Sequence, residues 1–315
     1  MKKSIDNTVL AGYNAGIEWD RLNIGIGRIE FAYTKELLTV HLPPPPAVIY
    51  DIGGGYGEYA WWLTSLGYEV HLFDLSETNI TMSAVLAEHY PGHILHAAEV
   101  CDARDIPRAD SSADAVLLMG PLYHITEYPE RIAAIKEVKR LLRPGGVLCA
   151  AALTPYSVLL HCITVYRTER SSKSHALDTP AFLSMVEREL HDGHHENPNL
   201  SVYHGLGTSH LHTAAMLRAE LSDGGFPNSE IHGVMGGAWL AHDIDALWED
   251  PDCRETLMKT VRLLDGHEEI IGLSGHLLGI TKNTENTRKR TTKCVLFLIM
   301  LVKGLDEPSR VKPTV

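Results

Sequence analysis

Short, mainly apolar runs alternate with segments of helical spacing along the first half of the chain. Such runs cover residues 48–52, 69–73, 113–119 and 146–153. Before the last run, apolar residues recur at helical spacing from 131 to 142 and end at Arg143-Pro-Gly-Gly146, a helix stop and turn. Strands that are covered on both faces are apolar throughout, so this alternation predicts a parallel, doubly wound α/β sheet.

A glycine-rich turn follows the first of these strands. Gly53, Gly55 and Gly57 alternate just before a helical segment, and glycines there let the backbone turn sharply and approach a ligand closely. Asp74 ends the next apolar run about twenty residues on, where a carboxylate can accept hydrogen bonds from ribose hydroxyls. The turn and the acid together predict a site for an adenosine-bearing cofactor. A purely structural glycine turn is less favoured because the acid stands at the right distance.

The glycine spacing also indicates which cofactor this is. A dinucleotide fingerprint aims a helix N-terminus at a pyrophosphate, but here the third glycine comes one residue early and Glu58 stands at the helix start. Its carboxylate would repel a diphosphate. S-adenosylmethionine carries a sulfonium cation and no phosphate, so acids such as Asp51 and Glu58 are acceptable beside it. We therefore expect S-adenosylmethionine and not NAD.

With Asp51-Ile-Gly-Gly-Gly-Tyr-Gly57 and Asp74, the chain resembles the class I S-adenosylmethionine-dependent methyltransferases, in particular their small-molecule, UbiE-type members. The resemblance continues through residues 98–107, where the family places an acid at the adenine amino group, and through residues 113–124. It implies that the cofactor contacts Asp51, Gly53, Gly54, Gly55, Gly57, Tyr59, Asp74, Leu75, Asp102, Ala103, Met119 and Gly120.

The resemblance also organises the rest of the chain. A helix over 213–221, N-capped by Thr213, and last strands at 229–235 and 275–282 complete a Rossmann-like, seven-stranded, mostly parallel sheet, with a helical stretch at 244–264. The expected parts are N-terminal helices (1–46), the core (47–153 and 213–283), an inserted helical cap (154–212) and a mobile tail (284–315).

Two of these parts have their own internal pattern. In the N-terminal part, helices are expected at 15–21 and 27–41, followed by a stiff proline connector at 43–46. The insertion is too long for an ordinary connection in an α/β unit. It contains an apolar segment (156–166), an amphipathic one (179–190) and a His-, Asn- and Gly-rich loop (192–207). A lid over the substrate is the natural interpretation.

Composition narrows the class of protein. A formal net charge of −12 argues against a nucleic-acid surface. The five cysteines are scattered without a C-x-x-C pair, which favours reduced thiols and no structural zinc. His191, His194 and His195 with Glu196 match no zinc motif and are expected in a solvated loop. No segment resembles a signal peptide or a membrane span. We expect a cytoplasmic enzyme, a monomer or homodimer, with a small-molecule substrate and no metal, nucleic-acid or membrane partner.

The candidate chemistry centres on Tyr123 and His124, which follow the fourth strand where the family places substrate-facing residues. A sulfonium is already an activated methyl donor, so the protein mainly holds a nucleophile in line, and a base helps if that nucleophile carries a proton. Imidazole suits neutral pH, which makes His124 the candidate base. The alternative is a histidine that shapes the pocket floor.

Further candidates lie in the leading segment and beside the lid. His212 is a catalytic candidate and His210 a substrate-binding one, since alternate residues of an extended segment share a side. Capping and loop polarity are the simpler explanation for either. Tyr13, Trp19 and Arg21 are expected at the substrate, with Arg21 pairing a substrate carboxylate or, alternatively, forming a surface ion pair.

Three functional classes remain open on these grounds. The first is a small-molecule methyltransferase acting on an O or N atom. The second is an RNA or protein methyltransferase, although the Asn-Pro-Pro-Tyr sequence of many such enzymes is replaced here by residues 120–123, Gly-Pro-Leu-Tyr. The third is a protein that keeps the cofactor pocket without transferring methyl groups.

Overall fold

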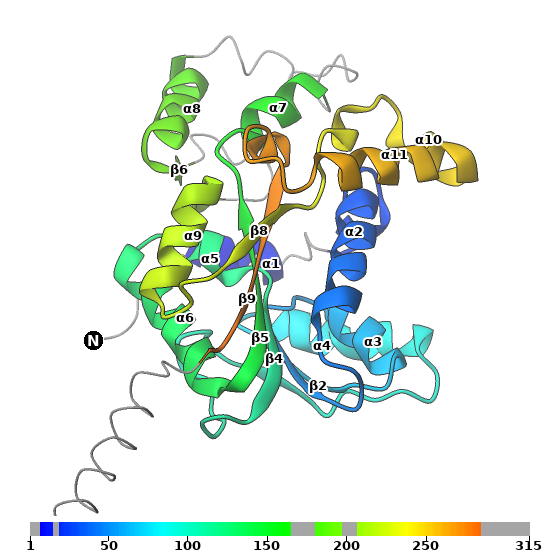
Figure 1. The fold of residues 1–315 in the computed structure, drawn as a ribbon, viewed down its shortest axis with the longest axis vertical. Coiled ribbons are helices and arrows are strands. Elements are labelled where there is room, and N and C mark those ends of the chain that lie inside the picture. The colour runs from blue at the N-terminus through cyan, green and yellow to red at the C-terminus, as the bar shows by residue number, and fades with distance from the viewer. Residues whose placement is uncertain (1–6, 15–18, 165–179, 197–206, 285–315) are drawn as a thin grey trace, which may run out of the picture. The chain divides into compact units, whose positions relative to one another are not determined.

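A seven-stranded sheet forms the centre of the computed structural model, which describes residues 7–14, 19–164, 180–196 and 207–284. Its order is β3-β2-β1-β4-β5-β9-β8 (Figure 1). Adjacent strands are parallel except that β9 is antiparallel to both β5 and β8. The strands are β1 (Val48–Ile52), β2 (Glu69–Asp74), β3 (Ala97–Val100), β4 (Ala113–Leu118), β5 (Leu142–Leu153), β8 (Glu230–Gly233) and β9 (His276–Lys282). The predicted doubly wound, mostly parallel sheet is confirmed.

Helices cover both faces of this sheet. Residues 115–118 of β4 are fully buried and belong alternately to two separate apolar clusters. Ala115 and Leu117 pack with α2, α3 and α11, whereas Val116 and Leu118 pack with α6 and α9. Burial on both faces explains why β4 is apolar at successive positions. The helices are α1 (Asn7–Asn14), α2 (Ile26–His41), α3 (Glu58–Ser65), α4 (Glu77–Leu86), α5 (Pro121–His124), α6 (Tyr128–Leu141), α7 (Ser157–Thr164), α8 (Pro180–Asp192), α9 (Ala214–Asp223), α10 (Ile244–Glu249) and α11 (Pro251–Leu264).

Side-chain caps explain where several helices begin. Thr213 caps α9 as expected, because its hydroxyl accepts a hydrogen bond from the Met216 amide at 3.2 Å. Asp250 accepts bonds from the amides of Asp252 and Cys253, both at 2.9 Å, and Pro251 occupies the first helical position. The helical stretch expected over 244–264 is therefore two helices, α10 and α11.

Two expectations about local structure were wrong. Of the helix expected over 15–21, residues 15–18 lie outside the described residues, while 19–20 form a turn and Arg21–Asn23 a short 3-10 helix. Helix α1 lies before the predicted helices and was not predicted. The turn expected at 143–146 lies within β5, which begins immediately after α6, with Gly145 at φ 85°.

The inserted segment is described in part. It contains α7, α8 and a two-stranded ribbon in which β6 (His194–Glu196) pairs antiparallel with β7 (Thr208–His210). The expected loop over 192–207 therefore includes a strand. His195 is buried and its Nδ1 lies 2.6 Å from Glu189 Oε1, so the solvated loop expected around it was wrong at this residue.

The sheet and its helices belong to one compact unit, residues 1–283. Of the tail expected over 284–315, only Thr284 is among the described residues, so this expectation lies outside them. Among the described helices, none is both long enough and apolar enough to cross a membrane.

Candidate active site

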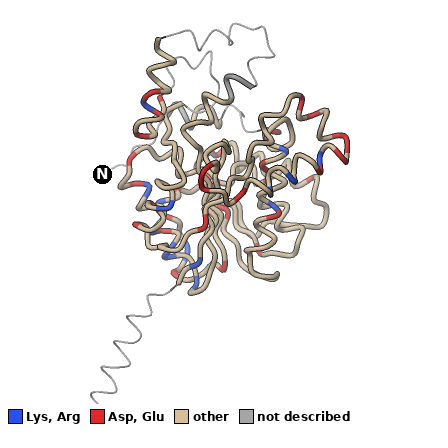
Figure 2. The backbone as a smooth tube through the Cα atoms, turned by 45° about the horizontal axis from the view of Figure 1, so that its top comes forward, with Lys and Arg blue, Asp and Glu red and all other residues tan. Residues whose placement is uncertain are grey.

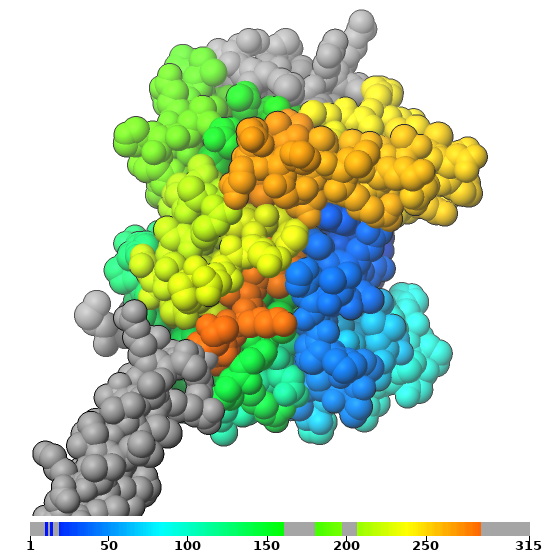
Figure 3. Space-filling model, viewed as in Figure 1, coloured from blue at the N-terminus to red at the C-terminus, as the bar shows by residue number. Residues whose placement is uncertain are grey.

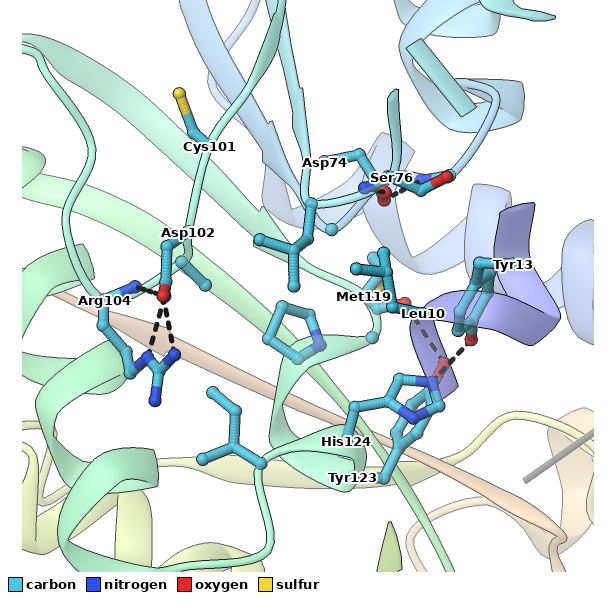
Figure 4. Close-up of a pocket in the computed structure, with 18 of the residues that line it drawn as sticks. Leu10, Tyr13, Asp74, Ser76, Cys101, Asp102, Arg104, Met119, Tyr123 and His124 are labelled. Atoms are coloured by element: carbon cyan, nitrogen blue, oxygen red, sulfur yellow. Dashed lines mark hydrogen bonds and ion pairs between the residues drawn. The ribbon is translucent and has the colours of Figure 1, made fainter. Parts of the chain in front are cut away.

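A cavity of about 330 Å³ opens at the carboxyl ends of the central strands (Figure 4). The loops that follow β1, β2, β3 and β4 each contribute to its wall. From the N-terminal part, Leu10, Tyr13, Arg21 and Leu22 complete the lining. In doubly wound sheets, ligands bind at this edge, and the motifs found in the sequence meet here.

The glycine turn after β1 forms one wall of the cavity. Gly53 and Gly55 have φ of 71° and 60°, a region that side-chain-bearing residues rarely adopt. A Cβ at Gly53 would lie 2.5 Å from Pro121 Cδ, whereas a Cβ at Gly55 would meet no atom within 4 Å and would enter open space. Gly55 lines the cavity, so its missing side chain leaves room for a ligand.

Asp74 connects this turn to the end of β2. Its Oδ2 accepts a hydrogen bond from the Gly55 amide at 2.9 Å, and its Oδ1 accepts from the Ser76 amide at 2.8 Å and from Asn79 Nδ2 at 3.0 Å. The carboxylate is thus held in place beside the cavity that it lines. A fixed acceptor at this point suits ribose hydroxyls, as the sequence predicts.

Asp51 lies below the glycine turn and does not line the cavity. It is fully buried, and a Cβ at Gly54 would lie 2.5 Å from its Oδ2. Burial, with a further contribution from the charge of Asp74, raises the pKa of Asp51 to about 7, and the nearby Ala60 amide only partly opposes this. Apart from this amide, neither carboxylate oxygen has a hydrogen-bond partner among the described residues. Gly57, at φ 87°, likewise serves the turn and does not line the cavity.

Asp102, the acid expected at the adenine, is held by Arg104, a residue that was not predicted at the site. Asp102 accepts bonds from Arg104 Nε at 2.8 Å and Nη2 at 2.6 Å, and Arg104 Nη1 donates to Glu130 at 2.8 Å. All three residues line the cavity. A basic residue two positions after the acid was a signal in the sequence that could have identified this pair.

Tyr13 and His124 lie next to each other in the lining of the cavity and point toward one another, as Figure 4 shows. The Tyr13 hydroxyl lies 2.5 Å from His124 Nε2, and the two rings are edge to face with centroids 5.1 Å apart. Tyr123 packs against His124 with centroids 4.6 Å apart, and its hydroxyl donates to the Met119 carbonyl at 3.4 Å. The structure thus brings these three predicted residues together from α1 and α5.

Arg21 also lines the cavity, but its ion pair is internal. Its Nη1 lies 2.7 Å from Oε2 of Glu30, a buried residue of α2. Burial alone would raise the pKa of Glu30, but the charges of Arg21 and His276 outweigh it and lower that pKa. Arg21 therefore does not form the surface ion pair considered from the sequence. Its guanidinium is already paired with a carboxylate of the protein itself. Trp19 does not line the cavity and contacts the Tyr56 ring at 5.4 Å.

His210 and His212 do not lie at the cavity, contrary to expectation. His212 is fully buried with its Nε2 3.1 Å from Glu220 Oε2, and Arg131 binds the same carboxylate at 2.7 Å. Burial would raise the pKa of Glu220, but these hydrogen bonds lower it to about 2. Burial and His212 lower the pKa of His210 to about 3, which keeps that imidazole neutral. Both histidines belong to a buried polar cluster between β7 and α9.

The sequence of this region matches known proteins. Residues 50–150 match a family described as a methyltransferase domain. The ubiquinone/menaquinone biosynthesis C-methyltransferase of Cellvibrio japonicus is 25% identical over 71% of this chain and 83% of its own. Residues 50–150 therefore form a methyltransferase domain of the class I S-adenosylmethionine-dependent superfamily.

Other members of this superfamily match over shorter stretches. The malonyl-[acyl-carrier protein] O-methyltransferase of Methylococcus capsulatus is 36% identical over 34% of this chain and 38% of its own. The tRNA (carboxymethyluridine(34)-5-O)-methyltransferase of Macaca fascicularis is 28% identical over 33% of this chain and 14% of its own. In both cases the match covers less than two fifths of the relative.

Solved structures share the fold. A putative S-adenosylmethionine-dependent methyltransferase from Listeria monocytogenes superposes with a TM-score of 0.52 at 16% identity, over 82% of this chain and 99% of its own. The putative methyltransferase in complex with the Haloferax volcanii Trm112 activator has a TM-score of 0.53 at 19% identity, over 87% of this chain and 98% of its own.

The cofactor of this methyltransferase is S-adenosylmethionine, and the residues of the cavity fit it. Gly55 leaves the space that a Cβ would fill, and Asp74 presents a fixed carboxylate. Glu58, at the start of α3, also lines the cavity. Its carboxylate suits a ligand that carries a sulfonium cation and no phosphate.

The first prediction concerns the open space at Gly55. Gly55→Ala puts a methyl group into the cavity, so we expect the affinity for S-adenosylhomocysteine, measured by calorimetry, to fall at least about tenfold, or 1.4 kcal/mol. Gly92→Ala is the matched control, because Gly92 also has a positive φ and open space at its Cβ but does not line the cavity. Both variants should lose about 1 kcal/mol of stability from backbone strain. Equal affinities in the two variants would contradict the assignment.

The second prediction concerns the buried acid. The folded-state pKa of Asp51 is raised from 3.8 to about 7, so the native state retains a proton that the unfolded state loses. The group therefore lowers the free energy of unfolding as pH rises from about 4 to 7. We expect Asp51→Asn to gain up to about 4 kcal/mol over the unaltered protein between pH 4 and pH 8, measured by urea unfolding without cofactor.

Asp110→Asn, at a side chain that is 77% exposed, is the control and should show no comparable gain. An advantage of Asp51→Asn that stays constant across this pH range would mean that the native carboxyl titrates normally.

Proposed function

We propose that this methyltransferase acts on an oxygen or nitrogen atom of a small molecule, with His124 as the base that removes the acceptor's proton. The hydrogen-bonded pair of Tyr13 and His124 inside the cofactor cavity is the observation that carries this proposal. The cofactor, when bound, supplies a methyl group that the sulfonium already activates. The task of the protein is therefore to orient the acceptor, exclude water and take up one proton.

Tyr13 connects the acceptor to the base in this proposal. Its hydroxyl accepts the proton of the acceptor atom while passing its own proton to His124 Nε2, which becomes an imidazolium and later releases the proton to water. This direction requires Nε2 to be the unprotonated nitrogen before the reaction. The 2.5 Å separation and the edge-to-face rings support direct transfer between the two groups. Tyr123, packed against His124, holds the imidazole in place.

A small acceptor is favoured over RNA by the charges of the site. Both arginines that line the cavity are engaged in ion pairs, Arg104 with Asp102 and Glu130, and Arg21 with Glu30. Lys and Arg are interspersed with Asp and Glu along the described backbone, as Figure 2 shows. A phosphate backbone is normally bound by a continuous basic patch. The net charge of −12 points the same way.

The third prediction tests the base. The acceptor is first identified by incubating the protein with labelled cofactor and either metabolite extract or bulk tRNA, and reading the products by mass spectrometry. With that acceptor, His124→Ala should lower kcat about 10²–10⁴-fold and leave the affinity for S-adenosylhomocysteine nearly unchanged.

Tyr13→Phe removes only the hydroxyl and should reproduce most of this loss, while His93→Ala, at an exposed histidine, is the control. Near-normal turnover in His124→Ala would remove it as the base. Label in tRNA alone would replace the small acceptor by RNA, as one of the relatives suggests.

We further propose that the insertion, residues 154–212, covers the acceptor. Tyr123 of the cavity packs with Leu153, Leu211 and Val158, so the insertion contacts the cavity wall directly. The Leu211 amide also donates to the Gly193 carbonyl at 2.7 Å, which ties the ribbon to the end of α8. A cover in this position would keep water from the acceptor.

The fourth prediction tests this cover by hydrogen exchange. If the insertion closes over the acceptor, the amides of α7 and α8 should exchange more slowly when both S-adenosylhomocysteine and the acceptor are bound than with S-adenosylhomocysteine alone. The amides of α11 are the internal control and should not change. Equal protection of α7 and α8 in both states would make the insertion a fixed part of the fold.

A further inference from the structure

Two histidines and a glutamate converge where α2 ends beside the edge strand of the sheet, away from the cavity lining. His41 is the last residue of α2, and Glu230 and His232 are alternate residues of β8, so their side chains share a face. One ligand atom from each of the three residues lies within 4.8 Å of the others. None of the three lines the cavity. In Figure 3, the surface of α2 and that of the segment from β8 to α11 lie side by side around this region.

A buried carboxylate sets the orientation of His232. Its Nδ1 lies 2.7 Å from Asp265 Oδ2, and the same carboxylate accepts from the Tyr33 hydroxyl at 2.7 Å and from the Gly233 amide at 2.9 Å. A carboxylate that already accepts hydrogen bonds from a hydroxyl and an amide is an acceptor toward the imidazole as well. The proton of His232 is therefore on Nδ1.

The other ring nitrogen of His232 is consequently a lone-pair donor. Its Nε2 is buried and has no hydrogen-bond partner among the described residues, and Glu230 Oε2 lies 3.9 Å away. An imidazole whose one nitrogen donates to a carboxylate while the other carries a lone pair is the arrangement found in metal-ligating histidines. A buried nitrogen without a partner carries a desolvation cost, which a bound cation would remove.

His41 and Glu230 complete the set of ligands. His41 brings a second imidazole to the same point from the end of α2. The two rings are 5.8 Å apart. The Glu230 side chain is 73% exposed, so a cation can enter from solvent and meet a negative charge. Lys282 is a nearby positive charge that would oppose a bound cation, but its side chain is exposed to solvent.

We propose that His41, Glu230 and His232 form a binding site for Zn²⁺, in which Asp265 positions His232. Two imidazoles and one carboxylate match the ligand types of zinc and leave a fourth position for water. Ni²⁺ and Cu²⁺ should also bind, because nitrogen ligands follow the same order of affinity. A cation here would join α2 to β8, and α2 carries Glu30, which holds Arg21 at the cavity.

Two other clusters of this type are weaker candidates. In one, Glu69 already bonds His71 Nε2 at 3.2 Å, which occupies that nitrogen. In the other, Arg131 binds Glu220 at 2.7 Å beside His210 and His212, and its positive charge opposes a cation. At His232, by contrast, the carboxylate that orients the ring, Asp265, is not one of the three proposed ligands, and the unpartnered Nε2 lies 3.9 Å from Glu230 Oε2.

The test is a titration of the full-length protein, stripped of metal with a chelator, against Zn²⁺ in competition with a chromophoric chelator. The unaltered protein should bind Zn²⁺, and His41→Ala and Glu230→Gln should each weaken that binding by at least about 10–100-fold. Co²⁺ should give the visible absorption of a tetrahedral site in the unaltered protein only. Zn²⁺ should raise its Tm and leave the Tm of His41→Ala unchanged.

His96→Ala, in the cluster with Glu69 and His71, is the matched control and should bind Zn²⁺ as the unaltered protein does. Circular dichroism of the metal-free variants checks that each is folded. His41 lies at a helix end, so its replacement should preserve the fold. Equal affinity in His41→Ala, loss of binding in His96→Ala instead, or no bound Zn²⁺ at all would overturn the proposal.

Discussion

Asp74 holds together the two loops that shape the cofactor side of the cavity, because its carboxylate accepts hydrogen bonds from both. One oxygen is bound by the Gly55 amide, and the other by Ser76 and Asn79 at the start of α4. These bonds position the glycine turn that leaves space for the cofactor. They also place a second negative charge near the buried Asp51, which contributes to the raised pKa of that acid. The glycine turn and the start of α4 are thus held by one fixed carboxylate.

The proposed acceptor side of the cavity depends on contacts between distant parts of the chain. Tyr13 of α1 meets His124 of α5, and Arg21 is held by Glu30 of α2. The N-terminal part is therefore a structural component of the site and brings both a hydroxyl and a paired cation to it. On the opposite side, Leu211 of the insertion packs on Tyr123. The cofactor half is built from strand ends, whereas the acceptor half is assembled from additions to the sheet.

The sequence predicted best where the physical cause is local. The apolar strands, the glycine turn, Thr213 as a cap and the acid at the end of β2 each reflect a backbone or burial requirement that acts over a few residues. The prediction was weaker at residues whose partners are remote. His212 was expected at the substrate because it is polar and near the lid, yet its partner is Glu220 on α9. Burial beside the Glu220 carboxylate determines where His212 lies. The spacing of residues along the chain does not report on such a contact.

The sequence by itself determined the class of fold, the cofactor and the superfamily, because periodicity and glycine spacing report directly on strands covered by helices and on a turn that approaches a ligand. Only the tertiary structure decided which polar side chains meet. Tyr13 and His124 are 111 positions apart, and Asp265 reaches His232 of β8 from the end of α11. Such pairs form where the packing of the helices on the sheet brings their ends together. The contacts in the proposed acceptor half of the cavity and in the proposed zinc site therefore result from packing, and no local sequence pattern predicts them.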